Sequence, residues 1–333
     1  MDANAQRELE PLIFHRYSME DGVPVSMLFT MAGRTDVCGI YILEFKDGAQ
    51  YVGQTINIVR RFGDHQHTHG DIIAFGFAIC ERQMLDIYER AVIKLQQQGN
   101  DLRNRLLTDL PGGRSDLEIE VSETATVKLP WDRDARSTIL NEPKKSMVGR
   151  FWQLTNRPDY SNIRTQIGRY IHETIPSPSQ TAGLLWTLTA LPSTNRAKDR
   201  RRLLTLNVCN IEALYVTEYD LQSGGAELEW SLNAWPSGLK RELQSLNRWG
   251  RREKVVVEPA SYKSSGPVER IASIGSDTFS RVLDQNTVIE AAYRLNVTMM
   301  RRSKSVFAKF HNQPFAADIF NEINGRMSAE EFN

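Results

Sequence analysis

The segment 38–53 constrains the fold of this chain more than any other stretch, because it has the pattern of a β-hairpin. Residues 38–45 form an apolar run with β-branched and aromatic side chains, which is typical of a buried strand. Lys46, Asp47 and Gly48 provide a turn signal, and a second short strand is expected at 50–53. The pattern predicts a small antiparallel sheet.

A helix is expected directly after this hairpin. Asn57 can cap it, because its side chain can accept a hydrogen bond from the backbone of the first turn. Ile58 and Phe62 lie four residues apart on the stripe that faces the core, while Arg61 and His65, also four apart, share an adjacent face. The helix therefore presents a cation and an imidazole side by side.

A third strand and a second helix complete this segment. Residues 72–80 are apolar, and residues 82–98 keep the helical period with Glu89 at the edge of the buried stripe. Asn104 follows, and residues 109–113 form the strongest chain breaker in the sequence. The predicted division is an N-terminal arm at 1–35, a first domain at 36–112 and a second domain at 113–333. The arm is expected to pack on the sheet or to bridge to the second domain.

The order of these residues resembles the GIY-YIG nuclease family over about residues 36–110. The matching positions are Gly39-Ile40-Tyr41, Tyr51-Val52-Gly53, Arg61, His65, Glu89 and Asn104, with Val52 in place of the isoleucine of the family name. The expected fold class is α/β (α+β): a small three-stranded antiparallel sheet flanked by helices, followed by a larger α+β domain. The resemblance implies an endonuclease with six catalytic residues, which are Tyr41, Tyr51, Arg61, His65, Glu89 and Asn104. Each residue type alone has ordinary structural roles, but all six in this order favour the catalytic interpretation.

Hydrolysis of a phosphodiester needs a positioned water, a proton acceptor and positive charge on the phosphoryl oxygens. Because the segment offers one well-placed acid, we expect one Mg²⁺ held by Glu89, with Mn²⁺ able to substitute. Arg61 would contact the scissile phosphate through its fixed fork of donors. In the family, the two tyrosines orient the water and the phosphate.

His65 would accept the proton of the water, either directly or through Tyr41. Asn104 would brace the site by hydrogen bonding. A second interpretation concerns His65, His67 and His69, which on a strand would face one side and could hold zinc. On a helix these side chains diverge, and the helical pattern favours solvated positions for His67 and His69.

The composition is that of a globular protein long enough for two domains, with 41% hydrophobic and 25% charged residues in a chain of 333. Neither a secretory signal nor a membrane-spanning run is apparent, and the three cysteines suit a reducing compartment. We therefore expect a cytoplasmic protein without a membrane partner.

The formal net charge is zero, but the two halves differ. Residues 1–112 carry 11 Lys and Arg against 15 Asp and Glu, whereas residues 113–333 carry 30 against 26. The second half is therefore expected to grip nucleic acid. Residues 287–310 are similar to a helix-turn-helix, with Asn296 in the turn and Thr298 as the cap of a recognition helix; an ordinary helical hairpin is the alternative. The predicted nucleic-acid contacts are Arg60, Arg61, Arg200, Arg201, Arg202, Arg301, Arg302 and Lys304.

The leading hypothesis is a DNA endonuclease that acts in restriction, antiphage defence or mobile-element cutting, and this context rests on the family resemblance alone. RNA is an alternative substrate. The rival hypothesis from another class is a catalytically silent nucleic-acid-binding or scaffold protein. A homo-oligomer, or a partner protein in a defence complex, is an open expectation.

Overall fold

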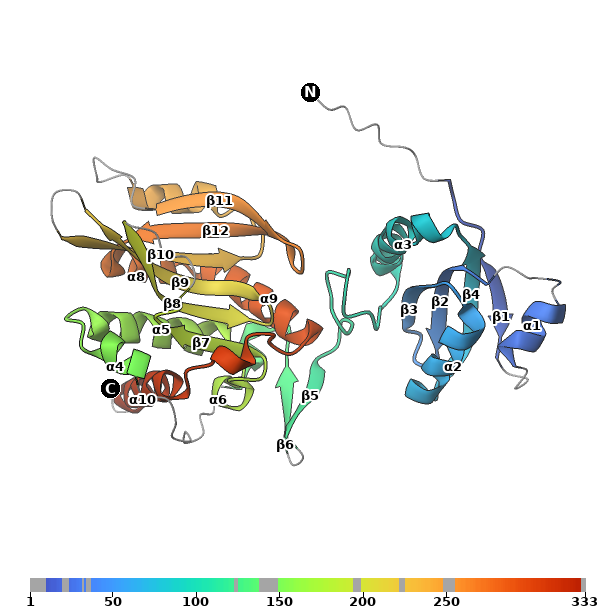
Figure 1. Ribbon diagram of the computed structural model, residues 1–333, viewed down its shortest axis with the longest axis horizontal. Helices are drawn as coiled ribbons and strands as arrows, with labels where there is room; N and C mark the ends of the chain where they lie inside the picture. Colours follow the sequence, from blue (N-terminus) through green and yellow to red (C-terminus); the bar gives the residue numbers. More distant parts are fainter. Residues whose placement is uncertain are drawn as a thin grey trace, which may run out of the picture. The chain divides into compact units, whose positions relative to one another are not determined.

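The predicted hairpin forms part of a four-stranded antiparallel sheet in the first of two units (Figure 1). The computed structural model describes residues 10–19, 24–31, 33, 37–122, 125–137, 149–193, 199–221, 225–247 and 255–330. Unit 1 is Met1–Arg114 and unit 2 is Ser115–Asn333. This division lies two residues after the boundary predicted from sequence.

Unit 1 contains the hairpin, helix, strand and helix that the sequence predicts. The strand order of its sheet is β1-β4-β2-β3, which leaves β3 at one edge. Asn57 caps α2, because its Oδ1 accepts a hydrogen bond from the Arg60 amide at 3.1 Å. The elements are β1 (His15–Ser18), α1 (Val25–Met31), β2 (Gly39–Phe45), β3 (Gln50–Thr55), α2 (Ile58–Thr68), β4 (Ile72–Ile79), η1 (Arg82–Met84) and α3 (Leu85–Gly99).

The sheet of unit 1 has an apolar core on each face, because successive side chains of a strand point to opposite sides. One core packs against α2 and contains Tyr41, Leu43, Phe45, Phe62, Phe75 and Phe77. The other packs against α3 and contains Ile40, Ile42, Val52, Val92, Ile93 and Leu102. A helix therefore covers each face of the sheet, α2 on one side and α3 on the other.

The N-terminal arm adds a strand that the sequence did not predict. β1 pairs antiparallel with β4, so that His15 lies opposite Phe77. Arg16 of this strand forms an ion pair with Glu44 at 2.8 Å. The sheet thus has four strands instead of the three expected, because a polar tetrapeptide carries no apolar pattern that would identify it.

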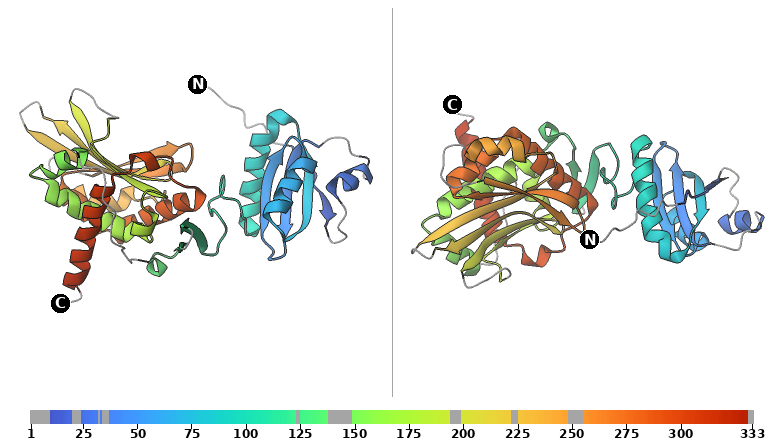
Figure 2. Two further views of the ribbon diagram at one scale, coloured as in Figure 1. Left: turned by 60° about the horizontal axis from the view of Figure 1, so that its bottom comes forward. Right: turned by 90° about the horizontal axis from the view of Figure 1, so that it is seen from above.

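Unit 2 is built on a six-stranded antiparallel sheet in the order β11-β12-β10-β9-β8-β7, and a separate hairpin joins β5 to β6. Helices α8, α9 and α10 contact the large sheet, and α5 packs on all three. In the right-hand view of Figure 2 the strands of this sheet lie in front of the helices. The strands are β5 (Leu117–Ser122), β6 (Ala125–Leu129), β7 (Trp186–Ala190), β8 (Arg200–Val208), β9 (Ile211–Asp220), β10 (Ala226–Ala234), β11 (Val255–Tyr262) and β12 (Gly266–Ile274). The helices are η2 (Arg133–Ala135), α4 (Gly149–Thr155), α5 (Tyr160–Thr174), α6 (Pro178–Thr181), α7 (Lys240–Leu243), η3 (Gln244–Asn247), α8 (Ser276–Leu283), α9 (Asn286–Arg302), η4 (Ala308–Phe310) and α10 (Gln313–Glu330).

One continuous helix, α9, occupies most of the segment in which a helix-turn-helix was predicted. Asn296, the predicted turn residue, is fully buried in this helix, and its Nδ2 donates to Tyr170 Oη at 3.1 Å. Thr298, the predicted cap, is buried one turn from the end of the same helix. The helix-turn-helix interpretation was wrong, because α5 satisfies the polar side chain of Asn296 and no turn is needed.

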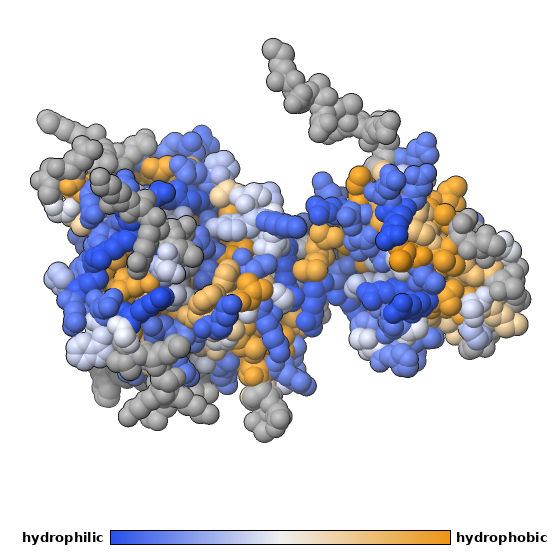
Figure 3. Space-filling view, viewed as in Figure 1, coloured by the Kyte–Doolittle hydropathy of each residue, from blue (hydrophilic) through white to orange (hydrophobic). Residues whose placement is uncertain are grey.

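Hydrophilic and hydrophobic residues are mixed over the visible surface of both units (Figure 3). Among the described residues, no helix combines the length and the apolar character needed to cross a bilayer. Cys38, Cys80 and Cys209 are free thiols.

Candidate active site

The register of the hairpin places Tyr41 directly opposite Gly53, and the Tyr41 side chain is fully buried. An ideal Cβ at Gly53 would lie 2.4 Å from Tyr41 Oη, so no larger residue fits there without a shift. Because Gly53 has no side chain, the Tyr41 ring can lie over the backbone of the edge strand β3. Gly39 is restricted in a similar way, since its Cβ would lie 2.0 Å from the Ala78 carbonyl oxygen.

Helix α2 supplies two partners for the Tyr41 hydroxyl. His65 Nε2 lies 2.7 Å from Tyr41 Oη, and Arg61 Nε donates to the same oxygen at 3.2 Å. The phenol can therefore accept from the guanidinium while it donates its own proton to the imidazole. This geometry follows from the spacing of four residues, which puts Arg61 and His65 on one helix face.

Burial keeps both members of the Tyr41–His65 pair neutral. Burial, the Arg61 charge and His69 together lower the pKa of His65 to about 4. Burial also raises the pKa of Tyr41 far above its usual range, although the hydrogen bond from Arg61 opposes this shift. At neutral pH the site thus contains a neutral imidazole, a neutral phenol and a guanidinium cation.

Tyr51 belongs to the same cluster and is half-buried. Its ring centroid lies 6.3 Å from that of Tyr41 and 5.1 Å from that of His65. The hydrogen bond to Tyr41 is the main reason that the pKa of Arg61 is raised, and Tyr51 adds to this shift. Four of the six predicted residues therefore form one cluster around Tyr41, namely Tyr41, Tyr51, Arg61 and His65.

Glu89 approaches the same edge of the sheet from α3 on the other face. Gln54 of β3 donates through Nε2 to Glu89 Oε2 at 3.1 Å and to Asp86 Oδ1 at 2.6 Å. Burial and the neighbouring Asp86 charge raise the pKa of Glu89, although the hydrogen bond from Gln54 opposes the shift. The negative charge of Glu89 acts in turn on Tyr41, because it helps to raise the pKa of the phenol.

Asn104 hydrogen-bonds to the backbone of Val52, the residue of β3 that lies between Tyr51 and Gly53. Its Oδ1 accepts from the Val52 amide at 2.9 Å, and its Nδ2 donates to the Val52 carbonyl at 2.8 Å. The chain just before it runs beside β3, where the Gln50 amide donates to the Asp101 carbonyl at 2.8 Å. Asn104 is thus fixed against the backbone of the edge strand and lies apart from the hydroxyl cluster.

Gln54 and the close packing at Gly53 are features of the site that the sequence reasoning missed. Gln54 directly follows the Tyr51-Val52-Gly53 motif, and alternation along β3 turns it toward α3. Its position after the motif was the available signal, but a glutamine at the end of a short strand is unremarkable by itself.

The eight basic residues predicted to contact nucleic acid divide into two groups. Five are exposed, namely Arg60, Arg61, Arg200, Arg201 and Lys304. Arg201 also forms an ion pair with Glu218. The other three, Arg202, Arg301 and Arg302, are buried.

The buried arginines bind groups of the protein itself, which corrects the prediction that they contact phosphates. Arg202 pairs with Glu212 at 2.9 Å and lies over the Tyr215 ring. Arg301 donates to the carbonyl of Leu129, and Arg302 donates to that of Ser264. A guanidinium that is satisfied by buried carbonyls cannot reach a phosphate without a rearrangement of the fold.

The residues that could hold a metal ion centre on Glu89. Within the described residues there is no group of three or more His, Cys, Asp and Glu side chains that could bind one, so the alternating histidines do not form a zinc site. Burial is the main reason that the pKa of the Glu89 carboxyl is raised, and the charge of Arg90 opposes this shift only in part. One carboxylate near a phosphate site fits Mg²⁺, which binds through one or two carboxylates and keeps several waters.

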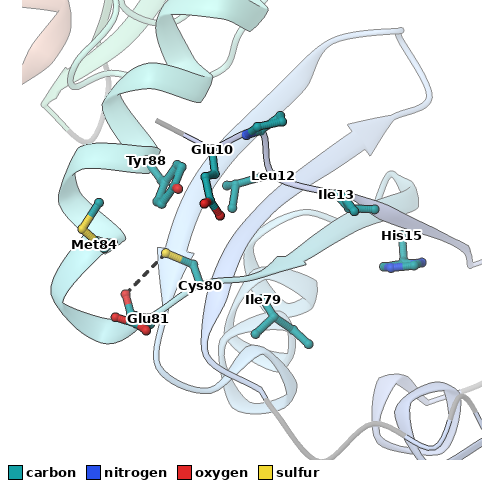
Figure 4. Close-up of a pocket in the computed structure, with 10 residues that line it drawn as sticks. Glu10, Leu12, Ile13, His15, Ile79, Cys80, Glu81, Met84 and Tyr88 are labelled. Atoms are coloured by element: carbon teal, nitrogen blue, oxygen red, sulfur yellow. Dashed lines mark hydrogen bonds between the residues drawn. The ribbon is translucent and has the colours of Figure 1, made fainter. Parts of the chain in front are cut away.

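A separate cavity of about 500 Å³ lies on the α3 side of unit 1 (Figure 4). Glu10, Leu12 and Tyr88 are among the residues that line it, and Cys80 Sγ contacts the Glu81 carbonyl at its rim at 3.4 Å. None of the six predicted catalytic residues lines this cavity.

Comparison with known protein families identifies one match. Residues 37–100 match the model of the GIY-YIG catalytic domain. The chain matches no curated protein and no solved structure. The match agrees with the resemblance seen in the sequence and indicates a nuclease-type function.

Proposed function

We propose that the GIY-YIG catalytic domain at residues 37–100 makes this protein a metal-dependent endonuclease that hydrolyses DNA phosphodiester bonds. The observation that carries the proposal is the arrangement around the Tyr41 hydroxyl, which contacts His65 at 2.7 Å and Arg61 at 3.2 Å. An ordinary buried tyrosine needs one partner. Here the two partners are a proton acceptor and a phosphate-binding cation.

Arg61 is the residue that would hold the scissile phosphate. Its side chain is exposed on α2, and its Nε–H is directed to Tyr41. The remaining donors of the guanidinium fork can bind two phosphoryl oxygens, as a planar guanidinium does in other phosphate sites. Arg60 is exposed beside it and would neutralise a neighbouring phosphate.

The Tyr41–His65 pair would move the proton of the attacking water. As the water oxygen forms its bond to phosphorus, its proton passes to Tyr41 Oη while the phenol proton passes to His65 Nε2. The bond from phosphorus to the leaving sugar oxygen breaks, and that oxygen takes a proton from solvent. Burial is the main cause of the lowered pKa of His65, and the Arg61 charge adds to it; a phosphate bound to Arg61 would offset this second contribution and make the imidazole a stronger base.

Glu89 and the adjacent Gln54 would hold the metal ion. GIY-YIG nucleases are generally dependent on a divalent metal, and the bound ion supplies positive charge to the phosphate in the transition state. Asn104 would act as a positioning residue, because it fixes the backbone between Tyr51 and Gly53.

The test is cleavage of plasmid DNA, single-stranded DNA and RNA with Mg²⁺, Mn²⁺ or EDTA. Glu89→Gln is the test variant, and Glu81→Gln is a matched control because Glu81 is exposed in the same domain outside the cluster. We expect metal-dependent DNA cleavage that Glu89→Gln abolishes and Glu81→Gln retains. Cleavage of RNA alone would change the substrate class, and binding without cleavage of any substrate would favour a silent binding or scaffold protein.

The proposed context is restriction, antiphage defence or mobile-element cutting, with cytoplasmic DNA as the target. Cutting of both strands would need a homo-oligomer, successive nicks or a partner protein, since one chain offers one site. Sedimentation of the protein with and without DNA would distinguish an oligomer from a monomer that nicks.

A further inference from the structure

The six-stranded sheet of unit 2 has one apolar face and one polar face. Leu206, Leu214 and Leu232 lie in the apolar core that the helices cover. On the alternate positions of the same strands are Asn207, Tyr215, Ser231 and Asn233. The polar face of such a sheet is usually solvated, yet these side chains are all buried. Long side chains cover part of this face, since Arg202 lies over the Tyr215 ring and Asn233 donates to Tyr262 Oη.

A cavity of about 590 Å³ lies at the β7–β9 end of the polar face. This volume is within the range of small-molecule pockets. Its polar lining includes Thr205, Asn207 and Glu212, and its aromatic lining consists of Tyr262, Phe307 and Phe310. The cavity thus combines hydrogen-bonding groups with aromatic rings.

Asn207 is the side chain that most clearly implies a ligand. It is only 6% exposed and lines the cavity, but within the described part of the chain its amide makes no hydrogen bond. The Thr205 hydroxyl, on the same face of β8, also has no partner among the described residues. Neither polar group is among the side-chain atoms that are sealed from solvent without a partner, so both face the open space of the cavity, where a ligand can replace water as their hydrogen-bond partner. A bound molecule would supply the missing partners.

The charges around the cavity limit what this molecule can be. Glu212 is already paired with Arg202 at 2.9 Å, and Arg202 lies 3.7 Å from the centroid of the Tyr215 ring. The carboxylate is therefore neutralised, and Arg150 is the remaining charged side chain of the lining. This environment does not favour a strongly charged ligand in the interior. It suits a flat, uncharged heterocycle, because amides pair with its edge and aromatic rings stack on its face.

We propose that this cavity binds a single nucleobase. Asn207 pairs with the hydrogen-bonding edge of the base, Thr205 donates or accepts one further bond, and the rings of Phe307 and Phe310 contact its face. Arg150 also lines the cavity and would contact a phosphate attached to the nucleoside. The base comes from a free nucleoside or nucleotide, or from an unstacked position in a nucleic-acid strand. The site belongs to unit 2 and does not depend on cleavage by unit 1.

The experiment uses the full chain in EDTA, which prevents metal-dependent cleavage. Each of the four deoxynucleosides, their monophosphates and short single-stranded oligonucleotides are titrated by calorimetry, and saturation-transfer NMR identifies the protons that touch the protein. Asn207→Leu removes the amide at nearly constant volume, and Thr205→Val removes only a hydroxyl. Thr217→Val is the matched control, because Thr217 is equally buried on the neighbouring strand but does not line the cavity.

We expect at least one base to bind, with Asn207→Leu weakening binding by about tenfold or more and Thr205→Val by a smaller factor. Thr217→Val should leave the affinity unchanged. Binding of the nucleoside supports a free ligand, whereas binding of the oligonucleotide alone supports a base held in a strand. The proposal would be overturned if none of these probes binds, or if the affinity is the same in the wild type and in both cavity variants.

Tryptophan fluorescence checks the folding of each variant, since Trp186 and Trp230 are buried in the core of unit 2. If Asn207→Leu fails to fold, Thr205→Val decides the question. The outcome is distinguishable from that of the nuclease proposal, because this binding is measured without metal and cleavage is measured with Glu89→Gln.

Discussion

Gly53 and Gly63 lie ten residues apart in unit 1, and the same change at the two positions should have opposite effects. At Gly53 a new methyl group would lie 2.4 Å from Tyr41 Oη and 2.5 Å from Tyr41 Cζ. At Gly63, in the middle of α2, nothing lies within 4 Å of the added atom. The pair separates the cost of a steric contact from the general effect of replacing glycine.

The magnitude at Gly53 follows from the overlap. An ordinary contact needs about 1 Å more, so Tyr41 or β3 must move by that amount; overpacking of this kind costs about 1–3 kcal/mol. The shift lengthens the 2.7 Å contact between Tyr41 and His65 beyond hydrogen-bonding distance. Since a displacement of about 1 Å at a reacting group can cost roughly 10²-fold in rate, cleavage should fall by that factor or more. Gly63→Ala should instead stabilise the helix by about 0.5–1 kcal/mol and leave cleavage intact.

The assay must report on unit 1 separately, because all six tryptophans lie between residues 131 and 249 in unit 2. Hydrogen exchange of peptides from residues 39–55 measures local stability at the hairpin. Tryptophan fluorescence should show the same unfolding of unit 2 in both variants. Wild-type exchange and wild-type cleavage in Gly53→Ala would refute the reasoning, because they would mean that the Tyr41 ring does not need the space at residue 53.

Four further predictions concern the same structure. Tyr41→Phe should lower the cleavage rate by about 10²–10⁴-fold with little loss of stability, because it removes the proton path and keeps the ring; single-turnover kinetics measure this. Burial and Arg61 lower the pKa of His65 to about 4, so the imidazole stays neutral in mild acid. In a pH profile of kcat/KM, the fall of activity on the acid side should therefore lie below pH 6.5. A fall centred at pH 6.5 would contradict the lowered pKa. Asn104→Ala should destabilise unit 1 by about 2 kcal/mol, because it leaves both buried backbone groups of Val52 unpaired, as hydrogen exchange of peptides from residues 50–55 would show. Arg301→Met should lower the unfolding temperature of unit 2 while DNA affinity stays the same, because the guanidinium binds buried carbonyls; weaker DNA binding at unchanged stability would contradict its structural role.

Local patterns made most of unit 1 predictable. The turn at 46–48, the cap at Asn57 and the helical period of α3 each depend on residues close in the chain, and all three elements are present. β1 was not predicted, because the polar run His15–Ser18 becomes a strand only through its pairing with β4. The role of Gln54 was missed for a related reason, since its partners Asp86 and Glu89 lie on a helix that packs across the sheet.

Three of the basic residues of unit 2 that were predicted to contact nucleic acid, Arg202, Arg301 and Arg302, are buried instead. A run such as Arg301-Arg302 has the composition of a solvated phosphate contact, but burial depends on segments far away in the sequence. Arg301 is satisfied by carbonyls at Leu129 and Ser115, which no local pattern connects to it. Asn296 was interpreted as a turn residue for the same reason, because its partner Tyr170 lies on α5.

The position of Asn104 determines where this protein can be divided. The family match ends at residue 100, whereas the two hydrogen bonds that hold Val52 come from a residue four positions later. The chain beyond Asn104 also folds back on it, since the Gly112 amide donates to the Asn104 carbonyl at 2.9 Å and the Arg114 amide donates to Asp101 Oδ1 at 2.8 Å. A fragment that stops at residue 100 would keep Tyr41, His65 and Glu89, but it would lose the two hydrogen bonds from Asn104 to the edge strand β3. We therefore expect a fragment of unit 1 that keeps all of these hydrogen bonds to extend to residue 114.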